Sequence, residues 1–144
     1  MCGTVRPDHL PSWIQFDFHP GDAQLRHLYS ISTVFLYPSR YEGFGLPPLE
    51  SMACGCPVVT TEVGAVPEFA ADRCNALVVP PRDVRGMADR LEELLLNPGL
   101  RDSLSARGLE TVERYAMTRV APCFGEALRH AFEGNGNASV AGRP

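Results

Sequence analysis

The sequence predicts an α/β fold, in which a partial, Rossmann-like parallel sheet of about three to four strands is flanked by helices. Three observations lead to this prediction. Short apolar runs of strand length recur along the first half of the chain. Segments with the apolar spacing of amphipathic helices separate these runs. A glycine-rich turn lies after one run and before a helix, which is where open α/β sheets bind ligands.

Four short apolar segments are the candidate strands, and they cover residues 13–18, 33–37, 57–61 and 76–79. Unbroken apolar runs are typical of parallel strands that are covered on both faces. In the doubly wound order 3-2-1-4-5-6 these segments would be strands three to six, without strands one and two. Either residues 13–18 fill the place beside residues 33–37, or an apolar edge of the sheet is left unpaired, and an open edge invites another chain.

The expected helices are recognised by their caps and by apolar residues three and four positions apart. Asp22 is the expected N-cap of a helix that reaches residue 30, and Asp83 is the expected N-cap of a helix that ends at residue 96. Two further helices are expected, over residues 100–115 and 118–132.

Length and composition limit the domain organisation and the partners. The 144 residues, 44% of them hydrophobic and 21% charged, are typical of one soluble domain with a single core. We expect residues 1–133 to form this domain, and the small, polar residues 134–144 to form a disordered tail. A net charge of −4 without a basic stripe argues against nucleic acid as a partner. No apolar run predicts a transmembrane segment or a signal peptide.

The cysteines argue for a reducing compartment. Their number, five, is odd, and they lack the C-x-x-C or Cys/His spacing of metal sites. We therefore expect no bound metal and a cytoplasmic location, with association with the inner face of the membrane as an alternative.

The strongest functional signal is the segment SRYEGFGLPPLESMACGCP, at residues 39–57. Glu42 and Glu50 stand on either side of its glycine loop. Free N–H groups of the loop can face an anion at a helix N-terminus, and they belong to Gly43, Phe44, Gly45 and Leu46. The paired prolines that follow suit the first helical turn. The pattern predicts a site for a nucleotide diphosphate sugar, with the ribose on Glu50 and the hexose near Glu42. The simpler alternative is a plain turn with two solvated glutamates.

The helix expected after the loop has its own markers. Leu49, Met52 and Ala53 form the apolar stripe that would face the core, and Gly55 suits the C-terminal stop of the helix.

The segment at residues 39–57 resembles the signature of the family 4 glycosyltransferases, which are retaining enzymes of the two-Rossmann GT-B fold. The resemblance extends over residues 14–132 and implies the C-terminal half of the second, donor-binding domain of such an enzyme. In that family the carboxylate matching Glu50 binds the ribose, and the carboxylate matching Glu42 lies by the donor sugar, the position implied to be catalytic. Residues 64–68 resemble the family's G-x-x-P-E stretch beside the donor site, with plain turn chemistry as the equal alternative.

One expected feature of the family is missing. Its C-terminal domain begins with a strand and a glycine-rich turn, whose Arg and Lys neutralise the pyrophosphate. No such turn is present here, and all 13 basic residues are arginine. Arg40, next to the loop, is the candidate replacement cation, and its alternative is a surface residue.

The resemblance implies a glycosyltransferase domain for retaining hexosyl transfer in polysaccharide biosynthesis, inactive alone. A nucleotide sugar would be its donor substrate, without a further cofactor. Two alternatives remain open: a non-catalytic donor-binding subunit of a split transferase, and a truncated, inactive fragment. The protein partners expected are an acceptor-domain chain, or a second copy that pairs through an open sheet edge.

Overall fold

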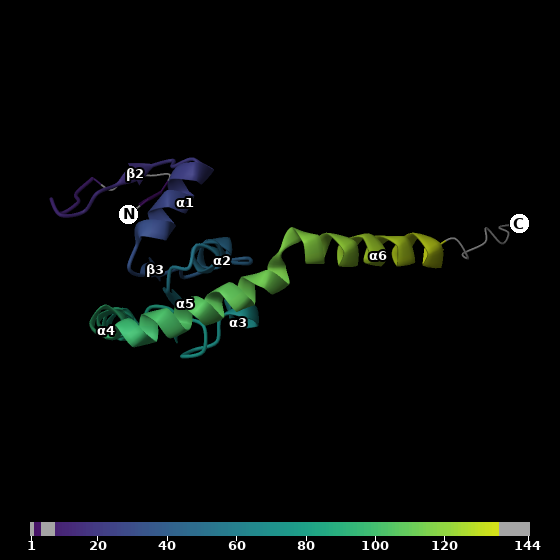
Figure 1. The fold of residues 1–144 in the computed structure, drawn as a ribbon. Coiled ribbons are helices and arrows are strands. Elements are labelled where there is room, and N and C mark those ends of the chain that lie inside the picture. Colours follow the sequence, from purple (N-terminus) through teal and green to yellow (C-terminus); the bar gives the residue numbers. More distant parts are fainter. Residues whose placement is uncertain (1, 4–7, 136–144) are drawn as a thin grey trace, which may run out of the picture.

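Three parallel strands form the centre of the fold in a computed structural model that describes residues 2–3 and 8–135 (Figure 1). In spatial order they are β3 (Phe35–Tyr37), β4 (Val58–Thr61) and β5 (Leu77–Val79). Each strand pairs in parallel with the next one along the chain. The predicted α/β fold with a partial parallel sheet is therefore confirmed.

The fourth expected strand, over residues 13–18, does not join this sheet. Only β2 (Asp17–Phe18) is extended there, and it pairs in parallel with β1 (Cys2–Gly3) in a separate ribbon. A turn interrupts the rest of the run, because the Ile14 N–H donates to the Pro11 carbonyl at 2.9 Å. Within the described residues β3 pairs only with β4, so the second alternative, an unpaired edge, is the one observed.

Helices cover both faces of the sheet and extend beyond it at one end of the molecule (Figure 1). In chain order the helical elements of the described residues are α1 (Asp22–Ile31), α2 (Leu46–Ala53), α3 (Val66–Phe69), α4 (Val84–Leu96), α5 (Pro98–Val112), the short 3₁₀ helix η1 (Glu113–Tyr115) and α6 (Met117–Asn135). The last helix takes up the first two residues of the expected tail, and residues 136–144 lie outside the described part of the chain.

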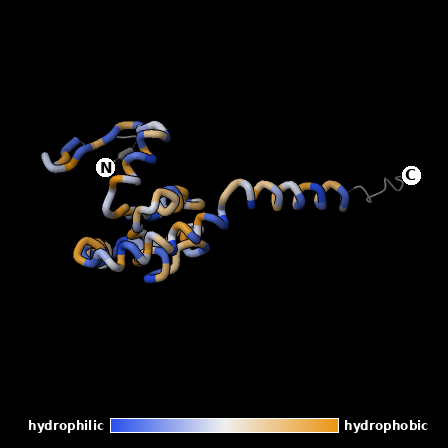
Figure 2. The backbone as a smooth tube through the Cα atoms, in the orientation of Figure 1, coloured by the Kyte–Doolittle hydropathy of each residue, from blue (hydrophilic) through white to orange (hydrophobic). Residues whose placement is uncertain are grey.

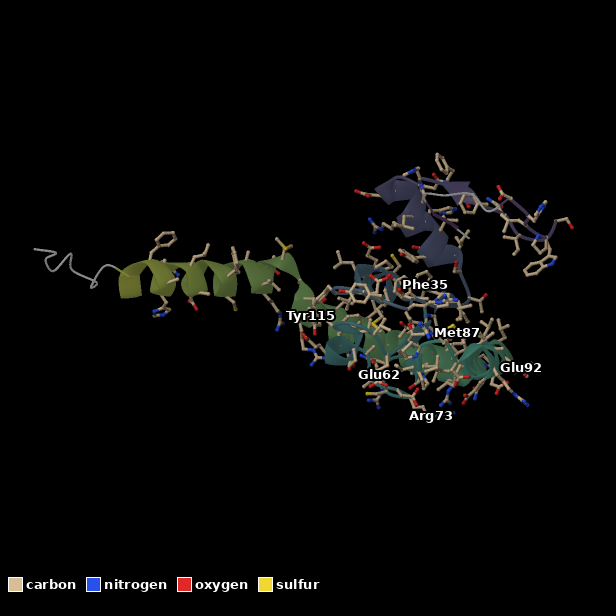
Figure 3. All side chains as sticks on the ribbon, turned by 180° about the vertical axis from the view of Figure 1, so that it is seen from behind. Phe35, Glu62, Arg73, Met87, Glu92 and Tyr115 are labelled. Carbon is tan, nitrogen blue, oxygen red and sulfur yellow. The ribbon has the colours of Figure 1, made fainter. Side chains whose placement is uncertain are left out.

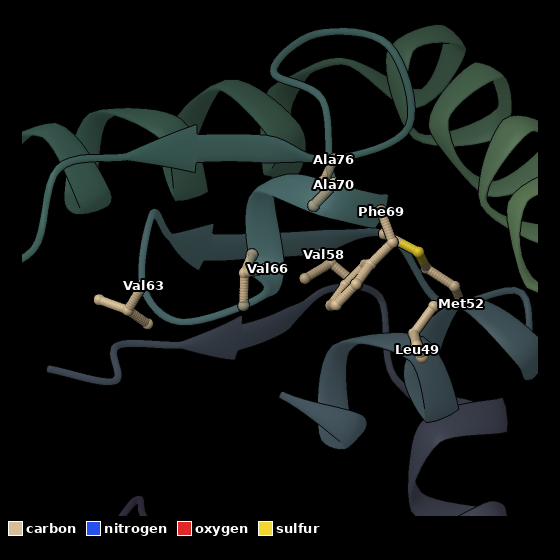
Figure 4. Close-up of a cluster of buried hydrophobic side chains, with 8 residues drawn as sticks. All are labelled: Leu49, Met52, Val58, Val63, Val66, Phe69, Ala70 and Ala76. Carbon is tan, nitrogen blue, oxygen red and sulfur yellow. The ribbon is translucent and has the colours of Figure 1, made fainter. Parts of the chain in front are cut away.

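The hydrophobic core has two parts, one on each face of β4. Val58 packs into the part that also contains Leu49, Met52, Val63, Val66, Phe69, Ala70 and Ala76 (Figure 4). Val59 packs into the part that also contains Leu77, Val79, Met87, Leu94 and Leu104. Successive residues of a strand point to opposite faces, so the burial of all four β4 residues explains why this Val-Val-Thr-Thr strand carries no charge on either face.

The two predicted N-caps have different outcomes. Asp83 caps α4 as expected, because its Oδ1 accepts a hydrogen bond from the Gly86 N–H at 2.8 Å. The prediction for Asp22 was wrong. Gly21 occupies the N-cap position of α1 without a side-chain bond, and Asp22 is the first helical residue, where its charge still favours the positive end of the helix.

Helix α2 ends in a tight hydrogen-bonded cap that turns the chain into β4. Gly55 adopts a left-handed φ of 73°, and its N–H donates to the Met52 carbonyl at 2.9 Å. The Cys56 N–H donates to the Ser51 carbonyl at 3.0 Å, which completes the motif. The expected glycine stop is thus confirmed.

The inner face of α2 is partly the one predicted. Leu49 and Met52 are buried as expected, but Ala53 is exposed, and Pro48 and Ser51 are buried instead. The buried positions are spaced three and four residues apart and form one face of the helix, and Ala53 lies outside that face.

Helix α6 projects away from the body as a nearly isolated arm (Figure 1). Hydrophilic (blue) and hydrophobic (orange) segments alternate along this helix in Figure 2. Tyr115 lies where this arm leaves the body (Figure 3). The large apolar side chains of α6 are exposed, namely Met117, Val120, Phe124, Leu128 and Phe132. None of the helices in the described ranges has the length and apolarity needed to span a membrane.

Candidate functional site

The glycine loop connects the carboxyl end of β3 with the start of α2, as the sequence predicted. Gly45 is the N-cap of α2, with a left-handed φ of 87°. A Cβ atom at this position would lie 2.9 Å from Cγ2 of Val66 in α3. Both the backbone conformation and the close approach of α3 therefore require glycine here.

A second glycine turn holds this loop from the side of β4. Gly64 has a φ of 55°, and a Cβ atom there would collide with the carbonyl groups of Glu42 and Gly43. The Ala65 N–H donates to the Gly43 carbonyl at 3.1 Å. The stretch that resembles G-x-x-P-E thus forms a turn and the short helix α3, and it packs directly against the glycine loop.

Glu42 is half-buried and is held by two hydroxyl groups. Its Oε1 accepts a hydrogen bond from the Tyr37 hydroxyl at 2.5 Å and another from Ser39 Oγ at 2.6 Å. The Thr61 hydroxyl donates to the Ser39 carbonyl at 2.6 Å, so the end of β4 helps to fix this arrangement. Burial, followed by the hydrogen bond to Glu42 and its charge, raises the pKa of Tyr37 well above its ordinary value.

Glu50 lies one turn into α2, where its side chain is exposed. Its Oε2 accepts a hydrogen bond from the hydroxyl of Tyr29, a buried residue of α1, at 3.2 Å. The two glutamates of the motif are therefore both partners of tyrosines, and these tyrosines come from elements that precede the motif in the chain.

The remaining predicted site residues of the motif belong to the loop itself. Gly43 is exposed, and Leu46 begins α2, so the loop leads its amides to the N-terminus of that helix. The ring of Phe44 packs against two other aromatic rings. Its centroid lies 5.8 Å from that of Phe69 and 6.0 Å from that of Tyr115. The loop backbone is thus fixed by a hydrophobic contact as well as by hydrogen bonds.

Arg40 is exposed, and in the part of the chain that the structure describes it forms no ion pair. Its role as the cation of the site stays a prediction. Among residues 2–3 and 8–135, no three His, Cys, Asp or Glu side chains gather in the manner of metal ligands.

A cavity of about 390 Å³ lies away from the glycine loop, between α3 and α5. Its lining includes Arg107 and Arg114, together with Glu68 and Glu110, so its charges are balanced. Pro67 and Glu68 are the lining residues that belong to the segment 64–68, and the glycine loop itself does not line this cavity.

Four residues that hold the loop or its carboxylates were not predicted from the sequence as site residues, and they are Tyr29, Tyr37, Ser39 and Thr61. A local signal existed for two of them, because Tyr37 and Ser39 precede Glu42 by five and three residues. Tyr29 is 21 residues from Glu50, and Thr61 is 22 residues from Ser39. No sequence spacing predicts contacts between residues so far apart.

The parallel sheet and the glycine loop between two anchored carboxylates define a domain of the GT-B glycosyltransferases, a class that the comparisons with known structures support. The chain belongs to the glycosyl transferases group 1, whose family model matches residues 9–111. The predicted family resemblance is thereby confirmed.

Two curated relatives illustrate the range of the family. O-antigen chain mannosyltransferase B of Escherichia coli is 38% identical over 104 residues, which are 72% of this chain and 27% of the relative. D-inositol 3-phosphate glycosyltransferase of Saccharomonospora viridis is 35% identical over 111 residues, which are 77% of this chain and 26% of the relative. The chain thus spans about a quarter of the length of these relatives.

Solved structures show the same fold. Sucrose-phosphate synthase from Thermosynechococcus elongatus matches with a TM-score of 0.79 and 30% identity, over 83% of this chain and 30% of the other. Anabaena HepE in complex with UDP-glucose matches with a TM-score of 0.73 and 19% identity, over 79% of this chain and 32% of the other. The second similarity concerns the fold alone.

Proposed function

We propose that this chain forms the donor-binding part of a retaining glycosyltransferase. Glu50 accepts the ribose hydroxyls of a nucleotide diphosphate sugar, the loop amides bind its pyrophosphate, and Glu42 lies beside the transferred hexose. One observation carries the proposal: the glycine loop is fixed at the carboxyl edge of the sheet, between two carboxylates that are each held by a tyrosine. Anabaena HepE, which shares the fold, was solved in complex with UDP-glucose, and this complex supports UDP as the first nucleotide to test.

In this proposal the chemistry relies on position and electrostatics. The leaving diphosphate is stabilised by backbone N–H groups at the N-terminus of α2, with Arg40 as the additional cation. The incoming hydroxyl attacks on the face from which the diphosphate leaves, which gives retention without a protein nucleophile. Glu42 orients the sugar and holds its reacting carbon at the loop.

The partner of this site is proposed to be an acceptor-binding domain. In this proposal the chain supplies the donor side of the site and the partner supplies the acceptor side, so we expect the chain alone to bind donor and not to transfer sugar. Two alternatives remain: the chain works with a separate acceptor chain, or it is an inactive fragment. Binding of the donor by the chain would favour the first alternative, and absence of binding would favour the second. The similarity to an O-antigen mannosyltransferase supports a role in polysaccharide biosynthesis, and the free cysteines among the described residues support the cytoplasm.

The direct test is calorimetric titration of the purified chain with UDP, GDP and ADP, each with and without its common sugar. Saturable binding is expected for one of the three. Glu50→Gln should weaken it by roughly 1.5–3 kcal/mol, the usual worth of hydrogen bonds to a charged group. Glu92→Gln on α4, an exposed position on another side of the body (Figure 3), is the matched control and should change nothing. Equal effects of the two substitutions would reject the ribose role of Glu50.

The loop needs a separate variant that leaves the fold intact. Gly45→Val is unsuitable, because the side chain would meet α3 and the backbone is left-handed. Gly43→Val is preferable, since a Cβ atom at Gly43 has no neighbour within 4 Å. It should keep the melting temperature and obstruct the phosphate. Unchanged nucleotide affinity in Gly43→Val would show that the loop is only a turn.

A further inference from the structure

Each of the two carboxylates of the motif accepts a hydrogen bond from a tyrosine hydroxyl, and the proposed function does not explain these two bonds. The Tyr37 hydroxyl donates a hydrogen bond to Oε1 of Glu42, and the Tyr29 hydroxyl donates a hydrogen bond to Oε2 of Glu50. Within the described residues, neither Oε2 of Glu42 nor Oε1 of Glu50 has a hydrogen-bond partner. Each carboxylate is thus held at one oxygen and open at the other.

The two tyrosine rings belong to one aromatic row. The ring of Phe35 lies between them, with its centroid 5.1 Å from Tyr29 in an edge-to-face contact and 5.8 Å from Tyr37 in a stacked contact. Phe35 also packs against the buried cluster around Val58. Aromatic pairs at these distances attract each other beyond their buried area, so the row restrains both hydroxyl groups relative to the core.

From this geometry we propose that Tyr37 and Tyr29 are positioning residues of the donor site, each turning the open oxygen of one glutamate towards the bound nucleotide sugar. The inference rests on the proposed function of Glu42 and Glu50. Tyr37 governs the contact with the hexose through Glu42, and Tyr29 governs the contact with the ribose through Glu50. The two tyrosines therefore act on different parts of one ligand.

The charges around Tyr37 favour this role. Burial is the largest cause of the raised pKa of the Tyr37 phenol, the hydrogen bond to Glu42 and the charge of Glu42 come next, and the charge of Glu50 adds a smaller contribution. The hydroxyl is therefore a protonated donor throughout the neutral range. The Tyr37 hydroxyl therefore keeps the proton with which it donates a hydrogen bond to Oε1 of Glu42.

The test compares donor with nucleotide alone in three Tyr→Phe variants of the chain. The ligands are UDP with UDP-glucose, GDP with GDP-mannose and ADP with ADP-glucose, and the pair that binds is used. Tyr37→Phe should lower the affinity for the nucleotide sugar by about three- to tenfold and leave the affinity for the nucleotide within about twofold. Tyr29→Phe should lower both affinities by a similar factor. Tyr41→Phe is the control, because Tyr41 is 88% exposed beside Glu42, and it should lower neither affinity.

A second readout works without ligand. In protein labelled with ¹³C at the glutamate carboxyl groups, Tyr37→Phe should move the Glu42 signal at neutral pH, and Tyr29→Phe should move the Glu50 signal. Unmoved signals, or equal losses of both affinities in Tyr37→Phe, would overturn the positioning role. If the wild-type chain binds none of the six compounds, the proposed function fails, and the carboxylate signals alone decide whether the tyrosines hold the glutamates.

Discussion

Strands β3 and β4 are neighbours in one sheet, but the structure covers them very differently. All four residues of β4 are buried between two hydrophobic clusters. No residue of β3 is fully buried, and Leu36 at its centre is 38% exposed. The glycine loop nevertheless leaves from β3. The comparison teaches that the loop takes its fixed position from the end of β4, through Thr61, and from the turn that follows, through Gly64 and Ala65.

The largest expected effect contrasts a buried strand residue with an exposed one. Leu77 on β5 is fully buried against β4, so Leu77→Ala should lower the free energy of unfolding by about 3–4 kcal/mol. Leu36→Ala on β3 should cost less, about 1–2 kcal/mol, because this side chain is 38% exposed and leaves less of a cavity. Chemical denaturation measures both values. Similar losses at the two positions would contradict the difference between the strands.

A smaller effect tests whether the turn after β4 holds the loop. Gly64→Ala must adopt a left-handed backbone and displace two carbonyl groups, which should cost about 2 kcal/mol. The same exchange at Gly43, where the new atom has open space, should cost less than about 1 kcal/mol. Thermal unfolding of both variants provides the comparison. A Gly43 variant that is the less stable of the two would place the anchor within the loop instead.

The smallest effect concerns the alkaline range. Because the folded state raises the pKa of Tyr37, it retains a proton that the unfolded chain releases near pH 10. Stability from this group is therefore complete below pH 10 and is lost as the pH rises further. The slope is a fraction of the ~1.4 kcal/mol per pH unit available to one group, since the ring is only partly buried. Tyr37→Phe should remove this loss of stability with rising pH, and urea unfolding at pH 9–11 would measure it. If the slope is unchanged in the variant, another group causes the loss.

The sequence was sufficient to predict the parts of the fold that have local causes. The helix after the glycine loop has its prolines in its first turn and is followed by the Gly55 stop, and both residue types act on their own backbone. Three strands were found at the expected segments because each is a short apolar run. The failure at residues 13–18 has a tertiary reason: among the described residues no strand of the central sheet lies beside them, and Trp13 and Phe18 remain exposed.

The site was predicted only as far as its own motif extends. Glu42 and Glu50 were recognised from the loop between them, but their tyrosine partners depend on how α1 and β3 pack beside α2. The contact between Gly64 and the loop likewise depends on the crossing of two segments that are distant in sequence. Such pairs are set by the packing of the elements, and no local pattern of residue types encodes them.

The projection of α6 has a consequence for the time scale on which the chain opens. Its 19 residues gain little from tertiary packing, and Pro122 removes one hydrogen bond from its first turns. Its amide protons should exchange with solvent through local fraying, long before those of β4, which are released only by global unfolding. A protease acting on the native protein would therefore cut this arm first and leave the glycine loop and its two glutamates on an intact body.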